Sequence, residues 1–127
     1  MSDKTWNIDE RAFEFACEVI ELCEKIRTRR GAAHFVASQL LRSGSSVGSN
    51  LWEARAGQSR ADFVGKARIA LKEARESHYW LRILVRTRLG PPPVVTRLAG
   101  EANEIVAILT SILKKTTKPS APKSTPH

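Results

Sequence analysis

The chain has 127 residues, of which 42% are hydrophobic and 27% charged, and this suits one globular domain that builds its core without disulfides or metals. It carries 21 Lys and Arg residues against 13 Asp and Glu residues, so its net charge is +8, an excess that favours a polyanionic partner. The sequence shows neither an N-terminal signal peptide nor a run of about 20 apolar residues, so we expect a cytoplasmic protein with no membrane contact.

Charge is unevenly distributed along the chain. Residues 1–26 contain seven acids and three bases, for a net charge of −4, whereas residues 27–127 contain six acids and eighteen bases, for a net charge of +12. An acidic helix at the start of the chain is therefore able to pair with a basic helix, either in the same chain or in a neighbouring copy.

Apolar residues recur every three or four positions over residues 9–27, which predicts an amphipathic helix after an N-terminal arm of residues 1–8. Glutamates form an acidic row beside the apolar face, and Gly31 ends the segment. The expected buried positions are Ala12, Phe13, Ala16, Cys17, Val19, Ile20, Cys23 and Ile26.

The two cysteines of the chain, Cys17 and Cys23, both lie in this first helical segment. At about 100° per residue they point to well-separated sides of a helix, so they are not expected to form a disulfide with each other. Two small apolar thiols of this kind fit a reducing compartment.

A second helix is predicted over residues 33–56, although residues 43–50 are mostly serine and glycine and would break it on propensity alone. One apolar face nevertheless continues through the segment, formed by Leu40, Val47, Leu51 and Ala54. Gly44 and Gly48 lie one turn apart and allow another backbone to approach closely, so we identify them as candidate residues for helix packing or oligomer contact. Trp52 falls off the apolar face and is the candidate for contact with a neighbouring subunit.

A third helix is predicted over residues 60–89. It begins at a capping box formed by Ser59 and Asp62, and it ends where Gly90 is followed by three prolines. Its expected apolar face consists of Phe63, Ala67, Ala70, Leu71, Ala74, His78, Leu81, Leu84 and Val85.

Basic residues and one tyrosine repeat at steps of three and four along this third helix, and together we call them the basic stripe: Arg68, Lys72, Arg75, Tyr79, Arg82 and Arg86. A row of guanidiniums can bind phosphates, and a tyrosine among them can stack on a base, so these are candidate nucleic-acid-binding residues. Alternatively, Glu73 and Glu76, or the acidic first helix, pair with the stripe and leave a solvated or salt-bridged surface. The pattern leaves both interpretations open.

A fourth helix is predicted over residues 94–115, and the remaining residues 116–127 are rich in Pro, Ser, Thr and Lys and are expected to form a disordered basic tail. The expected buried positions of the helix are Val95, Leu98, Ala102, Ile105, Val106, Leu109, Ile112 and Leu113. Four amphipathic helices joined by short connections predict an all-α fold, an antiparallel up-and-down four-helix bundle.

The sequence offers no catalytic or metal-binding pattern. His34, His78 and His127 are not spaced as metal ligands, and the serine-rich segment 43–50 lacks the spacing and lysine of a phosphate-binding loop. No serine lies in a G-x-S-x-G turn. We therefore expect no metal, no cofactor and no enzymatic activity.

Five segments together resemble one known family: QLLRSGSSVGSN at 39–50, EA at 53–54, SRADF at 59–63, ALKEARE at 70–76 and YWL at 79–81. They are similar to the four helix bundle protein family, which includes proteins encoded by intervening sequences in bacterial 23S rRNA genes and the accessory protein of diversity-generating retroelements. The resemblance covers about residues 11–115. Trp52 departs from it, since a smaller or polar residue is expected before Glu53.

This resemblance implies a homopentamer of bundles with a basic surface suspected of binding nucleic acid, and a reverse transcriptase as partner in the retroelement branch. Two functions follow as hypotheses. The first is a non-enzymatic homo-oligomer that binds RNA or DNA through the basic stripe. The second is a structural adaptor that docks a protein partner and uses the stripe for contacts between subunits.

Overall fold

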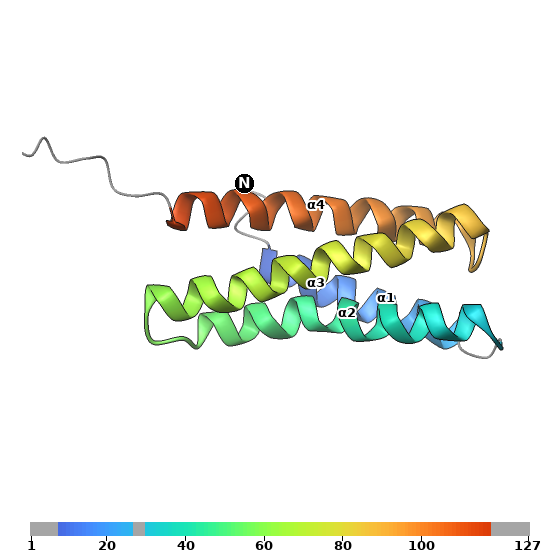
Figure 1. Cartoon of the computed structure of the whole chain (residues 1–127), viewed down its shortest axis with the longest axis horizontal. Coiled ribbons are helices and arrows are strands. Elements are labelled where there is room, and N and C mark those ends of the chain that lie inside the picture. Colours follow the sequence, from blue (N-terminus) through green and yellow to red (C-terminus); the bar gives the residue numbers. More distant parts are fainter. Residues whose placement is uncertain (1–7, 27–29, 118–127) are drawn as a thin grey trace, which may run out of the picture.

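The computed structural model describes residues 8–26 and 30–117, which form four α-helices (Figure 1). These are α1 (Ile8–Ile26), α2 (Ala32–Arg55), α3 (Arg60–Thr87) and α4 (Pro92–Thr117). Each helix packs against the helix before and after it in the chain, and α4 also contacts α1, so that the bundle closes. The predicted all-α up-and-down four-helix bundle is confirmed, and no strand occurs within the two described ranges.

The helix ends differ from the predicted ones by one or two residues. α1 already includes Ile8, which is fully buried, so the predicted arm loses its last residue, and residues 1–7 lie outside the described residues. α4 continues through Thr116 and Thr117, whose hydroxyls donate to carbonyls one turn earlier at 2.6 and 2.7 Å. The predicted tail therefore begins no earlier than residue 118, and residues 118–127 lie outside the described part of the chain.

The predicted capping box is present at the start of α3. The Asp62 backbone N–H donates to Ser59 Oγ, and the Gln58 N–H donates to the Asp62 carboxylate, both at 3.1 Å. α3 ends two residues earlier than predicted because Arg88 adopts a left-handed conformation with φ 59°. Gly90, with φ 81°, then supplies the turn into α4.

The buried face of α1 was predicted only in part. Phe15 and Leu22 fill the core, whereas Phe13 is 59% exposed and Ile20 is 44% exposed, so the prediction that these last two are buried is wrong. Apolar residues cover more than half of the circumference of α1, and the contacts with α2 and α4 bury only one side of it. α1 thus carries more apolar surface than one copy of the bundle covers.

The predicted faces of the other helices agree better with the structure. The four apolar residues chosen on α2 are all buried, and so are Ala67, Ala70, Ala74, Leu81 and Leu84 on α3. The prediction that Val85 belongs to the buried face of α3 is wrong, since this side chain is 41% exposed. On α4, Ile108 is buried, and the predicted Val106 and Ile112 are half-buried beside the core.

α2 runs unbroken through its serine- and glycine-rich middle because the hydroxyls there bond within the helix. Ser45 and Ser46 each donate at 2.8 Å to the carbonyl one turn earlier, on Leu41 and Arg42. Ser43 is fully buried and its hydroxyl lies 2.9 Å from that of Ser77 on α3, which is buried as well. This pair ties α2 to α3 without leaving a buried hydroxyl unpartnered.

Gly44 and Gly48 face α1. A Cβ atom on Gly44 would lie 2.9 Å from a methyl carbon of Val19, and one on Gly48 would lie 3.3 Å from the carbonyl oxygen of Ala12. The two glycines thus set the distance between α1 and α2. Their role in this structure is to pack two helices of the same chain together.

Cys23 is buried and its thiol donates to the Ala37 carbonyl at 3.3 Å, while Cys17 is half-buried. Neither is in a disulfide. In the described part of the chain, no helix is both long enough and apolar enough to cross a membrane.

Alanine substitutions at two glycines test the contact between α1 and α2. Gly44→Ala is expected to lower the free energy of unfolding by about 1–3 kcal/mol, the usual cost of overpacking. The reason is that Val19 is fully buried and its β-branched side chain has few rotamers. In the control, Gly65→Ala, the new methyl group meets open space.

Since alanine is favoured over glycine in a helix interior by about 1 kcal/mol, Gly65→Ala is expected to be stabilised. Urea denaturation measures both variants. Equal stabilisation of the two would show that α1 does not press on Gly44.

Candidate nucleic-acid interface

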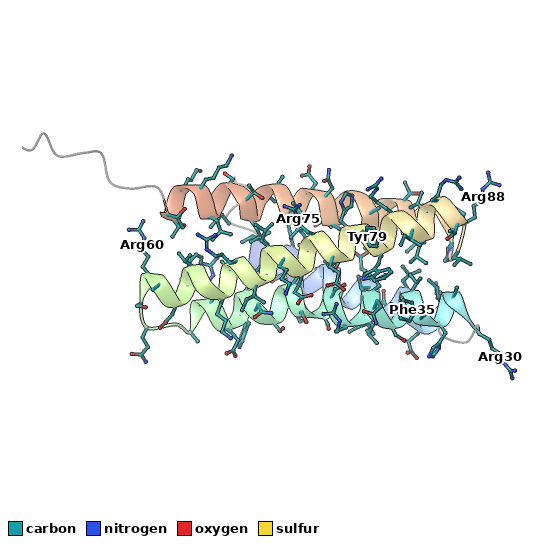
Figure 2. All side chains as sticks on the ribbon, in the orientation of Figure 1. Arg30, Phe35, Arg60, Arg75, Tyr79 and Arg88 are labelled. Carbon is teal, nitrogen blue, oxygen red and sulfur yellow. The ribbon has the colours of Figure 1, made fainter. Side chains whose placement is uncertain are left out.

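α3 carries the largest excess of positive charge in the molecule. Between Arg60 and Arg88 the chain has eight basic and three acidic residues. Figure 2 shows Arg60 and Arg88 at the two ends of α3, with Arg75 and Tyr79 between them. All five bases of the basic stripe are exposed, and Tyr79 is 55% exposed. The stripe spans about 27 Å at 1.5 Å per residue.

The carboxylates nearest to the stripe are bound by an arginine from another helix. Arg42 of α2 lies 3.2 Å from Glu73 and also forms an ion pair with Glu76. Within residues 8–26 and 30–117, no base of the stripe has a carboxylate within 4 Å. The predicted alternative, in which Glu73 and Glu76 pair with the stripe, is therefore wrong for the isolated chain. Sequence reasoning missed Arg42, since it lies 31 residues before Glu73.

Glu76 is held as an anion by two donors. The Arg42 guanidinium donates to it, and the indole nitrogen of Trp80 donates to the same oxygen at 3.0 Å. These hydrogen bonds, with Arg42 the larger cause, lower the pKa of Glu76 below its ordinary value although partial burial opposes them. Lys72 adds only a longer-range contribution to the same lowering.

Two acids of α1 pair with arginines of α2 and α4. Asp9 accepts from Arg55 of α2 at 2.7 Å, and Glu18 lies 2.7 Å from Arg97 of α4. α1 and α3 occupy opposite corners of the bundle, so the expectation that the acidic helix pairs with the basic stripe in the same chain is wrong. The positive charge of the stripe remains available to a partner.

One further ion pair joins α1 to α4. Arg11 donates to both carboxylate oxygens of Glu101 at 2.9 and 2.7 Å, and this bond raises the pKa of the guanidinium further. The pair is half-buried and lies away from α3, so it serves the bundle rather than the candidate interface.

Aromatic rings fix the position of Tyr79. Its ring centroid lies 5.2 Å from that of Trp80, with the planes at 71°, and Trp80 meets Phe35 of α2 at 5.9 Å and 84°. Such edge-to-face pairs are favourable arrangements of aromatic rings. Tyr79 is therefore supported by a contact with Trp80, while more than half of its surface faces solvent.

A shallow hollow of about 610 Å³ adjoins Tyr79, between α3 and α4, and we call it the Tyr79 hollow. Its lining includes Tyr79, Arg82, Ile83, Val85 and Arg86 of α3 and Ala99 of α4. Most of this lining is apolar, and the two arginines supply positive charge at its edge.

Burial, together with the charge of Arg82, lowers the pKa of nearby His78, so this imidazole is neutral at pH 7 and adds no charge to the stripe.

A second surface feature lies between α1 and α2, and we call it the α1/α2 groove. It has a volume of about 520 Å³ and is lined by apolar Phe13, Ala16 and Trp52, with Asp9 and Glu53 at its edge. Trp52 is 79% exposed, in agreement with its predicted position off the apolar face of α2. An exposed tryptophan beside an exposed phenylalanine is typical of a protein-binding surface.

The described residues contain no group of three or more His, Cys, Asp or Glu side chains arranged to hold a metal ion. His34 is exposed on α2 and His78 is half-buried on α3, whereas His127 lies outside the described part of the chain.

Comparison with known proteins gives a family match and a structural match. The family model described as 23S rRNA-intervening sequence protein matches residues 4–111. A crystal structure of a protein of unknown function from the S23 ribosomal protein family of Bacteroides thetaiotaomicron is 37% identical to this chain, with a TM-score of 0.76. The match covers 84% of this chain and 98% of that one. No curated protein is significantly similar to this sequence.

The bond network around Glu76 predicts a pH-dependent effect of Glu76→Gln. Because the pKa of Glu76 is lowered in the folded state, its carboxylate stabilises the fold above about pH 4.5, and this contribution is lost as the pH falls through the lowered pKa. The variant is expected to be less stable than the parent by about 1 kcal/mol at pH 7, and the difference is expected to be smaller at about pH 3, because the pH there approaches the lowered pKa of Glu76.

Chemical denaturation at the two pH values measures the difference. Glu14→Gln is the control, since Glu14 is exposed and has no described base within ion-pair distance, and it is expected to change stability little. A stability gap for Glu76→Gln that persists unchanged in acid would contradict the role of the carboxylate.

Proposed function

Because the chain belongs to the 23S rRNA-intervening sequence protein family and carries a basic stripe with no described carboxylate within 4 Å of its bases, we propose that it is a non-enzymatic, homo-oligomeric protein that binds RNA or DNA through that stripe. We place it in the cytoplasm, since its two cysteines are free and a reducing compartment preserves thiols. The proposal includes no metal, cofactor or catalytic step.

The observation that carries the proposal is that Arg42 forms ion pairs with Glu73 and Glu76. Left free, these two carboxylates would lie beside the stripe and repel phosphates. When they are paired with Arg42, the exposed side of α3 presents positively charged side chains along about 27 Å of helix. Over this length several phosphates of one strand can be contacted. Guanidiniums suit this task because they bind phosphate oxygens through two parallel N–H donors.

Self-association is the second part of the proposal, and the α1/α2 groove supports it. Phe13 and Trp52, which line this groove, are exposed large apolar side chains, and Ile20 of α1 is exposed as well. Exposed apolar surface of this kind is typical of protein interfaces. α1 lies diagonally across the bundle from α3, so a neighbour at the groove leaves the basic stripe of the same copy free. The pentamer implied by the family resemblance would repeat the stripe five times around one assembly.

The same groove favours a second candidate function, an adaptor that docks a different protein, such as a reverse transcriptase. Glu53 in its lining suits a partner that brings a basic residue beside an apolar centre, whereas Asp9 is already paired with Arg55. In this alternative the stripe serves contacts between subunits. The two candidates therefore differ in what happens to the assembly when the charge of the stripe is reversed.

Reversal of two central charges, Arg75→Glu together with Arg82→Glu, is expected to weaken binding to RNA and DNA at least about tenfold at about 100 mM salt. The slope of log affinity against log salt is expected to fall by about 1.4–1.8, since two phosphate contacts are lost. Fluorescence anisotropy with labelled oligonucleotides measures both quantities, and light scattering measures the mass of the assembly, which is expected not to change.

The control is Lys114→Glu with Lys115→Glu, which makes the same change in net charge at the exposed end of α4. It is expected to weaken binding far less. If the stripe variant dissociates the assembly instead, the adaptor function is favoured, and equal effects of the two variants on affinity would refute a specific role of α3. A companion variant, Trp52→Glu, is expected to reduce the mass toward the 14.1 kDa of one chain.

A further inference from the structure

We propose that the Tyr79 hollow receives an unpaired base, so that the ligand of the basic stripe is single-stranded nucleic acid rather than a duplex. This inference rests on the proposed function and names the substrate class of the same surface. It is carried by four observations: the way α3 is enclosed by its neighbours, the exposure of the Tyr79 ring, the support given to this ring, and its position within the row of arginines.

The first observation concerns access to a duplex. The major groove of DNA is about 12 Å wide and admits one α-helix, which is itself about 10–12 Å wide. α3 packs against α2 on one side and α4 on the other, and packed helices lie about 8–10 Å apart. These neighbours limit how deeply α3 can enter the groove. The backbone phosphates of a duplex are therefore more accessible to the stripe than its base edges.

The second observation concerns the tyrosine itself. In a regular duplex the faces of the bases are covered by stacking, so an exposed aromatic side chain finds no base to stack on, whereas a single strand offers every base face. Tyr79 is 55% exposed although it carries an apolar ring, and it contacts Trp80 in a T-shaped arrangement, so more than half of its surface is accessible to a ligand. Apolar Ile83 and Val85 continue from it into the hollow.

The third observation is that the ring is held in place before any ligand binds. Trp80 supports Tyr79, and Trp80 is in turn fixed by its hydrogen bond to Glu76 and by Phe35. Glu76 is fixed by Arg42. A ring that already has its binding orientation loses less conformational entropy when a base stacks on it.

The arginines complete the site. Arg75 lies one turn before Tyr79, and Arg82 and Arg86 lie one and two turns after it on the same side of α3. A strand that follows the stripe thus has phosphate-binding groups on both sides of the base that enters the Tyr79 hollow. Arg82 and Arg86 also line the hollow itself, where a guanidinium can stack on or donate to a base.

The test compares three ligands of about 12 nucleotides that carry equal numbers of phosphates per strand: oligo(dT) or oligo(U), an abasic strand, and a duplex. Tyr79→Ala is expected to weaken binding of the oligo(dT) and oligo(U) strands about five- to hundredfold, the usual loss for one stacked base. It is expected to leave the affinity for the abasic strand, and the salt slope for every ligand, unchanged. Tyr79→Phe, which retains the ring, is expected to bind as the parent does.

The outcomes separate this inference from the proposed function. If no ligand binds at low salt, the proposed function itself fails. If Arg75→Glu with Arg82→Glu weakens binding but Tyr79→Ala does not, the stripe binds nucleic acid and the base site is refuted. Equal affinity of the parent for the abasic and the oligo(dT) strands would refute it as well. Circular dichroism of the Tyr79 variants checks that the helices are retained.

Discussion

The pairing of Arg42 with Glu73 and Glu76 determines what the outer surface of α3 can do. It orients the two carboxylates nearest to the stripe toward α2 and offsets part of their negative charge, and Glu76 in turn accepts the hydrogen bond of the Trp80 indole. Charge and aromatic geometry on this surface thus depend on one arginine that belongs to a different helix. Partly exposed ion pairs of this kind contribute little to stability, so their main effect is on the field at the surface.

The bundle separates two surfaces with different chemistry. The α1/α2 groove is mostly apolar, and the basic stripe lies on the helix diagonally opposite α1. This separation follows from the up-and-down order, because the first and third helices of such a bundle never become neighbours. A homo-oligomer can therefore use one surface for its own contacts and the other for its ligand, and nucleic-acid binding and assembly do not compete within one copy.

The sequence was sufficient for the fold and for the position of the stripe, since both depend on helical periodicity. It was not sufficient for contacts between helices. Glu73 and Glu76 lay closest in sequence to the stripe, yet their partner comes from 31 residues or more away. α1 has apolar residues on more than one side, so helical periodicity alone does not show which of them face the core. Phe15 and Leu22 are buried, whereas Phe13 and Ile20 are exposed. Serine has a low helix propensity, so the serines of α2 argued against a helix in this segment. In the structure their hydroxyls donate to carbonyls one turn earlier, and such hydrogen bonds are compatible with a helix.

The most direct test of this account is the affinity for single-stranded nucleic acid of Arg42→Met compared with Arg55→Met. Both variants remove one exposed arginine of α2, but Arg55 pairs with Asp9 of α1 and lies over the ring of Phe63, and it binds neither Glu73 nor Glu76. Without Arg42, Glu76 becomes free to pair with Lys72 one turn away. The account predicts that Arg42→Met weakens binding several-fold more than Arg55→Met, and equal losses in the two variants would contradict it.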